Sequence, residues 1–439
     1  MMPLPRLIAL LSLTFLLTGL PGAAPAQDPE PQPGKAEVYI DINLDPGQKH
    51  RIAICDLLPS SGSGGEQATY LPNRLAANLA MTGLFTNLDK RSFLEADPRA
   101  GLDGQSSPDY AAWARLNAGY LVKGGITLSG SRLTLEMRLF DVAEKRQMLG
   151  KRYSGNVKDG RKMINQFTNA VLEAITGTPG VFGSQIIFAS GPPDRKSIMM
   201  TELGGDDATQ VAGYKGGPST QPTLGPGGRT AWVHRNGSSW ELVVDGKVVS
   251  SGPTHLSPAF MPNGTVAAAY SEAQKTSIYA FSGRAKTLLA GPGGINVSPT
   301  FSPDGSRLAF ASDLGGSSAI YLAPAGGGPP SRLTNTGKAT DPAWSPTGEL
   351  IAFVSRETDI CVIRPDGTGL RQLTGGQGAN YRPSFSPDGR MIVFSSTRNG
   401  RQQLFVMAAN GDSQQPLMPN YQPAQEQPYW SPTMPADFK

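Results

Sequence analysis

The chain has 439 residues, with 39 Lys and Arg against 35 Asp and Glu, and a formal net charge of +4 at pH 7. This length exceeds one ordinary domain, and basic residues that are scattered rather than clustered argue against a nucleic-acid-binding protein. The 53 Gly and 38 Pro are interleaved with apolar strand-like runs, which indicates many turns rather than disorder. We therefore expect two folded domains.

The first 26 residues have the pattern of a cleavable signal peptide. Arg6 precedes an apolar run over residues 7–17, and Ala24-Pro25-Ala26 forms a small-residue cleavage site before Gln27. A membrane anchor is the less favoured alternative, because the run is shorter than the roughly 20 apolar residues that span a bilayer. We expect cleavage near Ala26, export, and a soluble mature protein.

A proline-rich linker is predicted over residues 27–35, followed by an N-terminal α/β domain over residues 36–177. Alternating or apolar runs predict strands over residues 37–42, 51–57, 120–128, 132–141 and 147–153. Three helices are expected. The first is marked by Leu71, Leu75, Leu79 and Leu84 and ends near Gly83, and the second extends to Asn117 with Pro108 in its first turn. The third spans residues 158–175 and ends at Gly177.

Residues 181–434 repeat one motif, Pro-x-[Phe/Trp]-Ser-Pro-x-Gly, and an apolar strand follows each whole copy. Three copies are near-identical, two are weaker and the last is truncated. The leading prolines are Pro222, Pro258, Pro299, Pro342, Pro383 and Pro428. The steps between them are 36, 41, 43, 41 and 45 residues, a period typical of four-stranded propeller blades. In the best copy, residues 302–305 read Ser-Pro-Asp-Gly, which predicts a type I turn between two strands.

The two ends of this region complement each other. Residues 427–432 have the opening of a repeat without its second strand, whereas residues 183–190 read as such a second strand without an opening. A blade shared between both ends closes the ring and removes exposed sheet edges. We therefore predict an α+β N-terminal domain followed by an all-β six-bladed propeller with one split closing blade.

The sequence offers few parts for catalysis. It has no Gly-x-Ser-x-Gly motif, and its three histidines and two cysteines lack the spacing that holds zinc. Asp304, Asp366 and Asp388 each precede a glycine, and backbone conformation explains such turns better than calcium binding or acid catalysis does. Cys55 and Cys361 fall in different predicted domains, so we expect no disulfide between them. We assign no catalytic residue, no cofactor and no metal.

His255 lies in the loop that enters a blade, just ahead of Pro258. A histidine in such a loop is usually a solvated surface residue, and a partner contact is the alternative. A second class of function, an exported lyase or glycosidase that acts on envelope polymers in the propeller funnel, needs clustered acidic and basic residues at its mouth. The loops there carry mainly Thr, Asn, Ser and Gln with isolated Asp341, Arg382 and Glu426, which favours an adaptor.

This order of features resembles the TolB family, the periplasmic propeller proteins of the Tol-Pal system. The resemblance is carried by Glu37-Val-Tyr-Ile-Asp-Ile42, by Ile-Thr-Gly-Thr-Pro-Gly-Val-Phe over residues 175–182, and by Pro428-Tyr-Trp-Ser-Pro432. It implies a periplasmic adaptor without catalysis, a monomer, that contributes to outer-membrane integrity and to constriction during cell division. It also implies two partners, the lipoprotein Pal and the inner-membrane-anchored TolA, with other outer-membrane proteins or imported toxins as further candidates.

The resemblance further implies which residues bind these partners. For Pal, they lie in the loops ahead of each Pro-x-[Phe/Trp], at the propeller mouth. These are Thr220, Gln221, His255, Ser257, Asn296, Val297, Thr340, Asp341, Tyr381, Arg382, Glu426 and Gln427, with Ser298 in the same loops. For TolA, they are Glu37, Val38, Tyr39, Ile40, Asp41, Ile42 and Asn43, a segment expected to add as a strand to a sheet edge of the partner. In the family this segment lies close to the mature N-terminus, whereas here residues 27–35 precede it.

Overall fold

The computed structural model describes residues 49–434, apart from residues 61–63, 215, 273–274, 284 and 292. The predicted signal peptide, the linker and the segment of residues 37–43 lie outside the described residues. Over the described part of the chain, no helix has both the length and the apolar character needed to cross a membrane.

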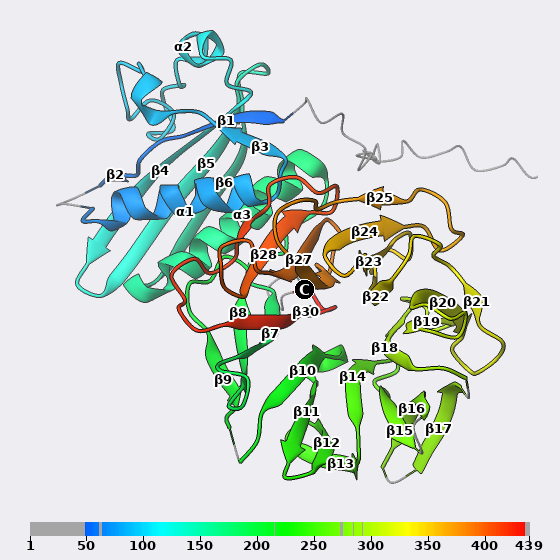
Figure 1. The fold of residues 1–439 in the computed structure, drawn as a ribbon. Helices are drawn as coiled ribbons and strands as arrows, with labels where there is room; N and C mark the ends of the chain where they lie inside the picture. The colour runs from blue at the N-terminus through cyan, green and yellow to red at the C-terminus, as the bar shows by residue number, and fades with distance from the viewer. Residues whose placement is uncertain are drawn as a thin grey trace, which may run out of the picture. The chain divides into compact units, whose positions relative to one another are not determined.

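The N-terminal domain is a mixed sheet packed against two helices (Figure 1). Its elements are β1 (His50–Ile54), β2 (Leu58–Pro59), α1 (Gln67–Met81), β3 (Phe85–Asn87), η1 (Lys90–Ser92), α2 (Tyr110–Arg115), β4 (Tyr120–Ser129), β5 (Arg132–Asp141), β6 (Arg146–Asn156), η2 (Val157–Asp159) and α3 (Gly160–Thr176). The strand order is β3-β1-β4-β5-β6, with β1 parallel to both of its neighbours. Leu75 of α1 and Phe167 of α3 are fully buried in the core beneath the sheet. The strands predicted over residues 120–128, 132–141 and 147–153 are confirmed as β4, β5 and β6, which pair as an antiparallel meander.

Helix boundaries differ from the sequence-based expectation where a capping residue decides them. Pro108 is not in the first turn of α2, because Asp109 is the N-cap and its carboxylate accepts a hydrogen bond from the Ala112 amide at 3.0 Å. Leu84 lies beyond the end of α1, and residue 158 lies in η2 rather than in α3. The predicted stop at Gly177 is confirmed: its φ is 76°, and its amide donates to the Glu173 carbonyl at 2.8 Å.

The described residues after Phe182 form six four-stranded sheets, which confirms the six-bladed propeller (Figure 1). The strands of each blade are given from the innermost outward. Blades 1 to 3 consist of β10 (Ser219–Leu224), β11 (Thr230–Asn236), β12 (Ser239–Val244) and β13 (Lys247–Gly252); of β14 (His255–Phe260), β15 (Val266–Glu272), β16 (Lys275–Ser282) and β17 (Ala285–Ala290); and of β18 (Asn296–Phe301), β19 (Arg307–Ser312), β20 (Ala319–Pro324) and β21 (Ser331–Arg332). Blades 4 to 6 consist of β22 (Ala339–Trp344), β23 (Ile351–Ser355), β24 (Asp359–Ile363) and β25 (Arg371–Gln372); of β26 (Asn380–Phe385), β27 (Met391–Ser396), β28 (Gln403–Ala408) and β29 (Gln415–Pro416); and of β30 (Gln425–Trp430), β7 (Gln185–Ser190), β8 (Ser197–Glu202) and β9 (Thr209–Ala212).

Blade 6 is the predicted split blade. Its innermost strand β30 comes from the C-terminal part of the chain and pairs antiparallel with β7, with Trp430 opposite Ile186. The Trp430 indole is 1% exposed and donates to the Ser184 hydroxyl at 2.7 Å. The ring is therefore closed by a strand pair that brings together residues about 240 positions apart.

The Ser-Pro-Asp-Gly turn of blade 3 explains its aspartate without any ligand. The Gly305 amide donates to the Ser302 carbonyl at 2.8 Å, and Gly305 has a φ of 71°, which glycine adopts at little cost. The Asp304 carboxylate accepts from the hydroxyls of Ser302 and Ser306. These bonds to the charged form lower the pKa of Asp304 to about 2.

Each blade has two ends. We call the end at which the innermost strands begin the mouth face, and the end that carries the Ser-Pro-x-Gly turns the turn face. The N-terminal domain contacts the turn face: Arg74 of α1 donates to the Gly204 carbonyl at 2.7 Å and pairs with Asp206 at 2.9 Å in the β8–β9 turn. Arg390 of the β26–β27 turn donates to the Thr176 hydroxyl at 3.1 Å. The mouth face lies at the opposite end of the blades.

Candidate partner-binding site at the propeller mouth

Each innermost strand has a β-bulge at its leading proline. The residue before the proline has a φ between 49° and 55° in all six blades. These residues are Gln221, Ser257, Ser298, Asp341, Arg382 and Gln427, which we call the polar ring. A left-handed backbone is unfavourable for a non-glycine residue, and such strained positions cluster at binding and active sites. The strain here recurs in six equivalent positions, so the blade geometry imposes it.

Hydrogen bonds join the polar ring from blade to blade. The Gln427 side-chain carbonyl accepts from the Gln221 amide at 2.9 Å, and the Gln221 side-chain carbonyl accepts from the Ser257 amide at 2.5 Å. The hydroxyl oxygens of Ser257 and Ser298 lie 3.4 Å apart, and the Ser298 hydroxyl donates to the Asp341 carboxylate at 3.1 Å. The ring therefore couples blade 6, which closes the propeller, to blades 1 to 4.

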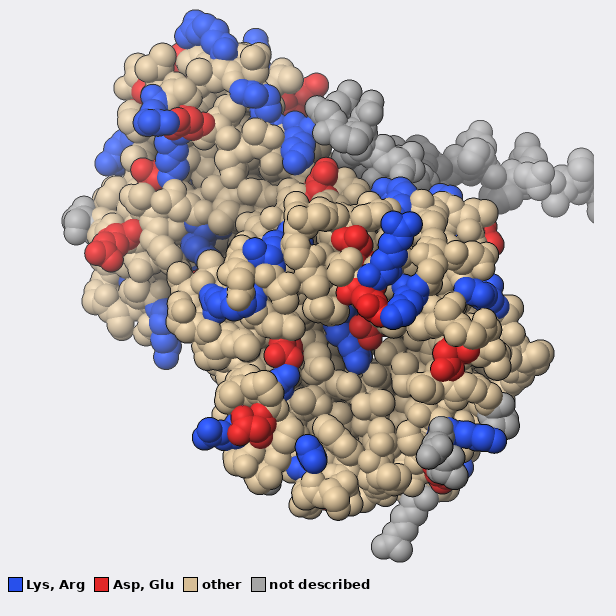
Figure 2. All heavy atoms as spheres, in the orientation of Figure 1, with Lys and Arg blue, Asp and Glu red and all other residues tan. Residues whose placement is uncertain are grey.

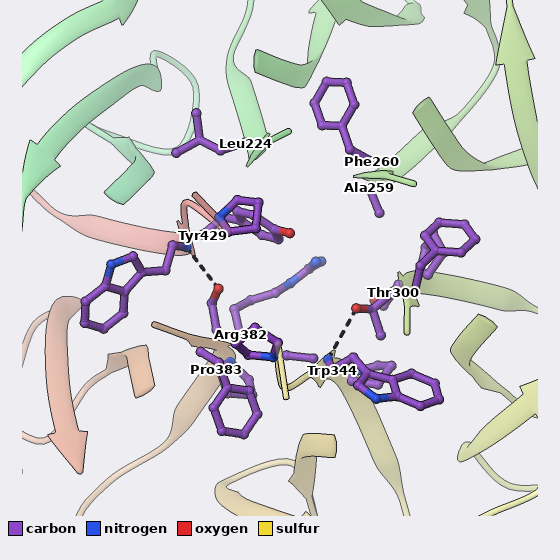
Figure 3. A pocket seen from close by; sticks show the side chains of 18 of the residues that line it. Leu224, Ala259, Phe260, Thr300, Trp344, Arg382, Pro383 and Tyr429 are labelled. Carbon is purple, nitrogen blue, oxygen red and sulfur yellow. Dashed lines mark hydrogen bonds between the residues drawn. The ribbon is translucent and has the colours of Figure 1, made fainter. Parts of the chain in front are cut away.

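Arg382 crosses the channel. Its Nε forms an ion pair with Asp341 Oδ1 at 3.0 Å, and its Nη1 and Nη2 donate to Ser257 Oγ at 3.2 and 3.3 Å. Blades 5 and 2, which carry Arg382 and Ser257, lie opposite each other in a ring of six. Figure 3 shows the Arg382 side chain extending from beside Pro383 into the middle of the cavity.

Below the polar ring lies a cavity of about 550 Å³ that follows the propeller axis. Both the leading prolines and the prolines of the turns contribute to its wall. The turn prolines are Pro226, Pro262, Pro303, Pro346, Pro387 and Pro432. Figure 2 shows the hollow at the centre of the propeller as a mostly uncharged surface, with acidic and basic atoms side by side at its edge. A rigid, preformed pocket of this size with few polar groups is typical of a binding site.

The structure brings most of the predicted Pal-binding residues to the mouth as half-buried side chains. These are Thr220, Gln221, Val297, Thr340, Asp341, Tyr381, Arg382, Glu426 and Gln427. Ser257 and Ser298 are 6% and 7% exposed but belong to the polar ring. The Glu426 carboxylate is paired with Lys196 at 2.5 Å, so its charge is already compensated within blade 6.

Two predicted residues are not surface groups. Asn296 is 2% exposed, and its amide donates to the carbonyls of Thr276 and Gly293 at 3.0 and 3.1 Å. His255 is 0% exposed, so the interpretation of it as a solvated loop residue is wrong, and its ring has no surface to offer a partner. The first residue of an innermost strand is turned into the blade, whereas the residue before the proline is turned toward the channel.

His255 packs among aromatic rings. Its ring centroid lies 4.8 Å from that of Tyr270 and 5.7 Å from that of Phe281. Neither ring nitrogen has a hydrogen-bond partner among the described residues. Burial, with a smaller contribution from the nearby Lys286 ammonium, lowers the pKa of His255 to about 4. The imidazole is therefore neutral at physiological pH.

Sequence reasoning missed two apolar residues on the mouth face. Ile295, just ahead of β18, is 52% exposed, and Leu314, in the β19–β20 loop, is 48% exposed. Asp313 holds the two loops together, because its carboxylate accepts from the Ile295 amide at 2.6 Å. The sequence pattern that could have indicated these exposed residues is a large apolar residue beside two glycines. It occurs in Gly293-Gly294-Ile295 and in Leu314-Gly315-Gly316.

The described residues contain no group of three or more His, Cys, Asp or Glu side chains that could hold a metal ion. Asp341 and Arg382 are the charged residues in the cavity wall, and they are paired with each other. This pair supplies hydrogen-bonding and charged groups at the mouth.

The polar ring gives a stability prediction. Replacing Gln221 by alanine leaves the buried Ser257 amide without its acceptor, which we expect to lower the free energy of unfolding by about 1 to 2 kcal/mol. Urea unfolding followed by circular dichroism measures this, with Gln210→Ala, an exposed glutamine of β9, as the matched control. Equal unfolding midpoints for the two variants would contradict a structural role of the ring.

The fold and the mouth together define a two-domain propeller protein with a preformed binding channel. Two family models match the chain: the TolB amino-terminal domain over residues 38–148 and the TolB beta propeller domain over residues 172–434. The chain is 31% identical over 441 residues to the protein TolB homolog of Chlorobium luteolum, which covers 97% of this chain and 98% of that protein. The chain belongs to the TolB family.

Two further comparisons agree with this assignment. The Tol-Pal system protein TolB of Syntrophotalea carbinolica is 34% identical over 194 residues, an alignment that spans 44% of this chain and 45% of the relative. The crystal structure of TolB from Acinetobacter baumannii superposes with a TM-score of 0.76 at 23% identity and covers 88% of this chain and 97% of that one. At this identity the superposition supports the fold.

Proposed function

We propose that this protein is a periplasmic, non-enzymatic adaptor of the Tol-Pal system, whose mouth face binds the lipoprotein Pal. A segment at residues 37–43, outside the described residues, is proposed to bind TolA. Through these contacts the protein contributes to outer-membrane integrity and to constriction during cell division. Export by the signal peptide of residues 1–26 delivers it to the periplasm.

The observation that carries this proposal is the polar ring. It presents strained hydrogen-bonding groups at the end of the channel opposite the N-terminal domain, buried at Ser257 and Ser298 and half-buried at the other four positions. The exposed Ile295 and Leu314 flank it. A rigid polar centre next to exposed apolar side chains is typical of a protein-binding surface, where a few anchors supply most of the affinity. The membership of the chain in the TolB family supports Pal and TolA as the partners.

The test is calorimetric titration of the mature chain with the periplasmic domain of Pal from the same organism. Wild type is expected to bind saturably, and Ile295→Arg is expected to weaken binding by more than about tenfold, because it places a charge in the apolar part of the interface. Leu370→Arg is the matched control, since Leu370 is 45% exposed and lies at the turn face.

Absence of binding by wild type, or equal weakening by both variants, would overturn the placement of Pal at the mouth face. The second site is tested in the same way with TolA. Deletion of residues 37–43 is expected to abolish TolA binding and to leave the titration with Pal unchanged.

A further inference from the structure

We infer that the channel mouth recognises a carboxylate side chain that a protein partner inserts, and that Arg382 is the residue that determines this specificity. The inference rests on the proposed function, in that the partner docks on the mouth face. Beyond the proposed function, the inference names the chemical group that enters the channel and the residue of this chain that recognises this group.

The hydrogen bonds of the Arg382 guanidinium show which of its edges is underused. Its inner edge is held by a charged partner, because Nε lies 3.0 Å from Asp341 Oδ1 in an ion pair. Its outer edge has no charged partner among the described residues, because Nη1 and Nη2 both donate to one neutral oxygen, Ser257 Oγ, at 3.2 and 3.3 Å. The two terminal nitrogens of a guanidinium form a fork that matches the two oxygens of a carboxylate, and such charge-assisted pairs are about twice as strong as neutral hydrogen bonds.

The position of the fork makes it available. The Arg382 side chain is 25% exposed, and it extends across the cavity (Figure 3) to the Ser257 hydroxyl of the opposite blade. Asp341, at 16% exposure, fixes the orientation of the guanidinium before any partner arrives. A donor group that is already oriented loses little conformational freedom on binding, which increases affinity.

The charge distribution of the cavity wall favours an anion over a cation as the inserted group. Asp341 has its charge compensated by Arg382, whereas the fork of Arg382 meets a single hydroxyl. An inserted ammonium would face the guanidinium at the centre of the channel. An inserted apolar side chain would leave the fork on Ser257 and gain nothing from Arg382.

The first arm of the test uses the Pal titration with two substitutions of Arg382. Arg382→Lys keeps the charge but removes the fork, and Arg382→Gln removes both. We expect both variants to bind more than about tenfold more weakly than wild type, with Gln the weaker. Arg364→Lys and Arg364→Gln, at an exposed arginine of the turn face, are the matched controls and are expected to bind as wild type does. Circular dichroism and urea midpoints check that every variant is folded.

The second arm does not need the partner. In ¹⁵N-arginine-labelled protein, the Arg382 Nε–H signal, assigned by its loss in Arg382→Lys, is expected to shift saturably with propionate. It is expected not to shift with propionamide, the neutral analogue of the same shape. Because this measurement does not use Pal, it tests carboxylate recognition by Arg382 even if the titration with Pal shows no binding and the proposed function fails.

Each outcome decides the inference. Loss of affinity in both Arg382 variants together with a propionate-specific shift supports it. If the Arg382 variants bind Pal with wild-type affinity, the inference is overturned and the proposed function stands. A propionate shift in that case identifies a site for small free carboxylates instead. Equal shifts with propionate and propionamide overturn carboxylate recognition.

Discussion

Replacing Glu95 by alanine is expected to lower the free energy of unfolding of the N-terminal domain by about 3 to 5 kcal/mol, because it leaves a buried ammonium unpaired. Lys123 Nζ lies 2.5 Å from Glu95 Oε2, and the two side chains are 2% and 7% exposed. Removing one charge of such a pair leaves the full desolvation cost of the other. A Lys123→Met, Glu95→Leu double variant removes both charges and is expected to recover most of the loss.

The N-terminal domain contains its own control for this prediction. Glu136 and Arg152 form an ion pair of neighbouring strands at 3.3 Å, with side chains 46% and 72% exposed. Water screens such a pair, so Glu136→Ala is expected to change the free energy of unfolding by less than about 1 kcal/mol. Urea unfolding followed by circular dichroism compares the two alanine variants. If Glu95→Ala costs no more than Glu136→Ala, the buried pair does not have the energetic role that its burial indicates.

The buried pair also explains how the loop before α2 is held in place. Glu95 lies in this loop, and its Oε1 accepts from the Asp109 amide at 3.2 Å. Asp109 in turn caps α2 through the Ala112 amide. One carboxylate thus ties the loop both to β4 and to the start of a helix. Neither link can be read from the sequence, because Glu95 and Lys123 are separated by 27 residues without a repeated pattern.

The propeller could be predicted from the sequence because its information is local and repeated. Each copy of the motif supplies its own turn, as at Gly305, and the complementary ends around residues 183–190 and 427–432 imply the split blade. The three strands of the N-terminal meander could also be predicted, because alternating or apolar runs mark residues 120–128, 132–141 and 147–153.

The polar ring could not be predicted in the same way. A residue before proline is normally extended, so the sequence of Gln221-Pro222 or Arg382-Pro383 gives no reason to expect a φ near 50°. The register shift at the leading proline is seen only in the structure, where it recurs in all six innermost strands. The contact between Arg382 and Ser257 likewise depends on two blades that face each other only after the ring has closed.

His255 shows the limit of local interpretation most clearly. Asn296, Asn380 and Gln425 begin the innermost strands of other blades, and their buried amides are hydrogen-bonded. His255 occupies the equivalent position in blade 2 without a partner for either nitrogen. Tyr270 and Phe281, which bury it, come from β15 and β16, so its environment is created by neighbouring strands rather than by its own loop.

This burial gives the second large prediction, a loss of stability in mild acid. In the unfolded chain the His255 imidazole takes up a proton near its ordinary pKa of about 6.5, whereas in the folded protein its pKa is lowered to about 4. Between these values the unfolded state binds more protons, so the free energy of unfolding falls as the pH falls. A shift of this size corresponds to at most about 3 kcal/mol, lost mainly between about pH 6.5 and pH 4.

The variant His255→Leu separates this contribution from the other titrating groups. It removes the imidazole while keeping an apolar side chain against Tyr270 and Phe281, and we expect its stability at about pH 7 to match or exceed that of wild type, because no buried nitrogen remains unpaired. Lys286, whose ammonium lies over the rings of Tyr270 and Tyr279, is unchanged in the variant, so its charge affects both proteins equally. Urea unfolding at a series of pH values should give curves that diverge below about pH 6.5. If the wild type and His255→Leu lose the same free energy between about pH 7 and pH 4, the imidazole does not stay neutral in the folded blade and must gain access to water or to a hydrogen-bond acceptor.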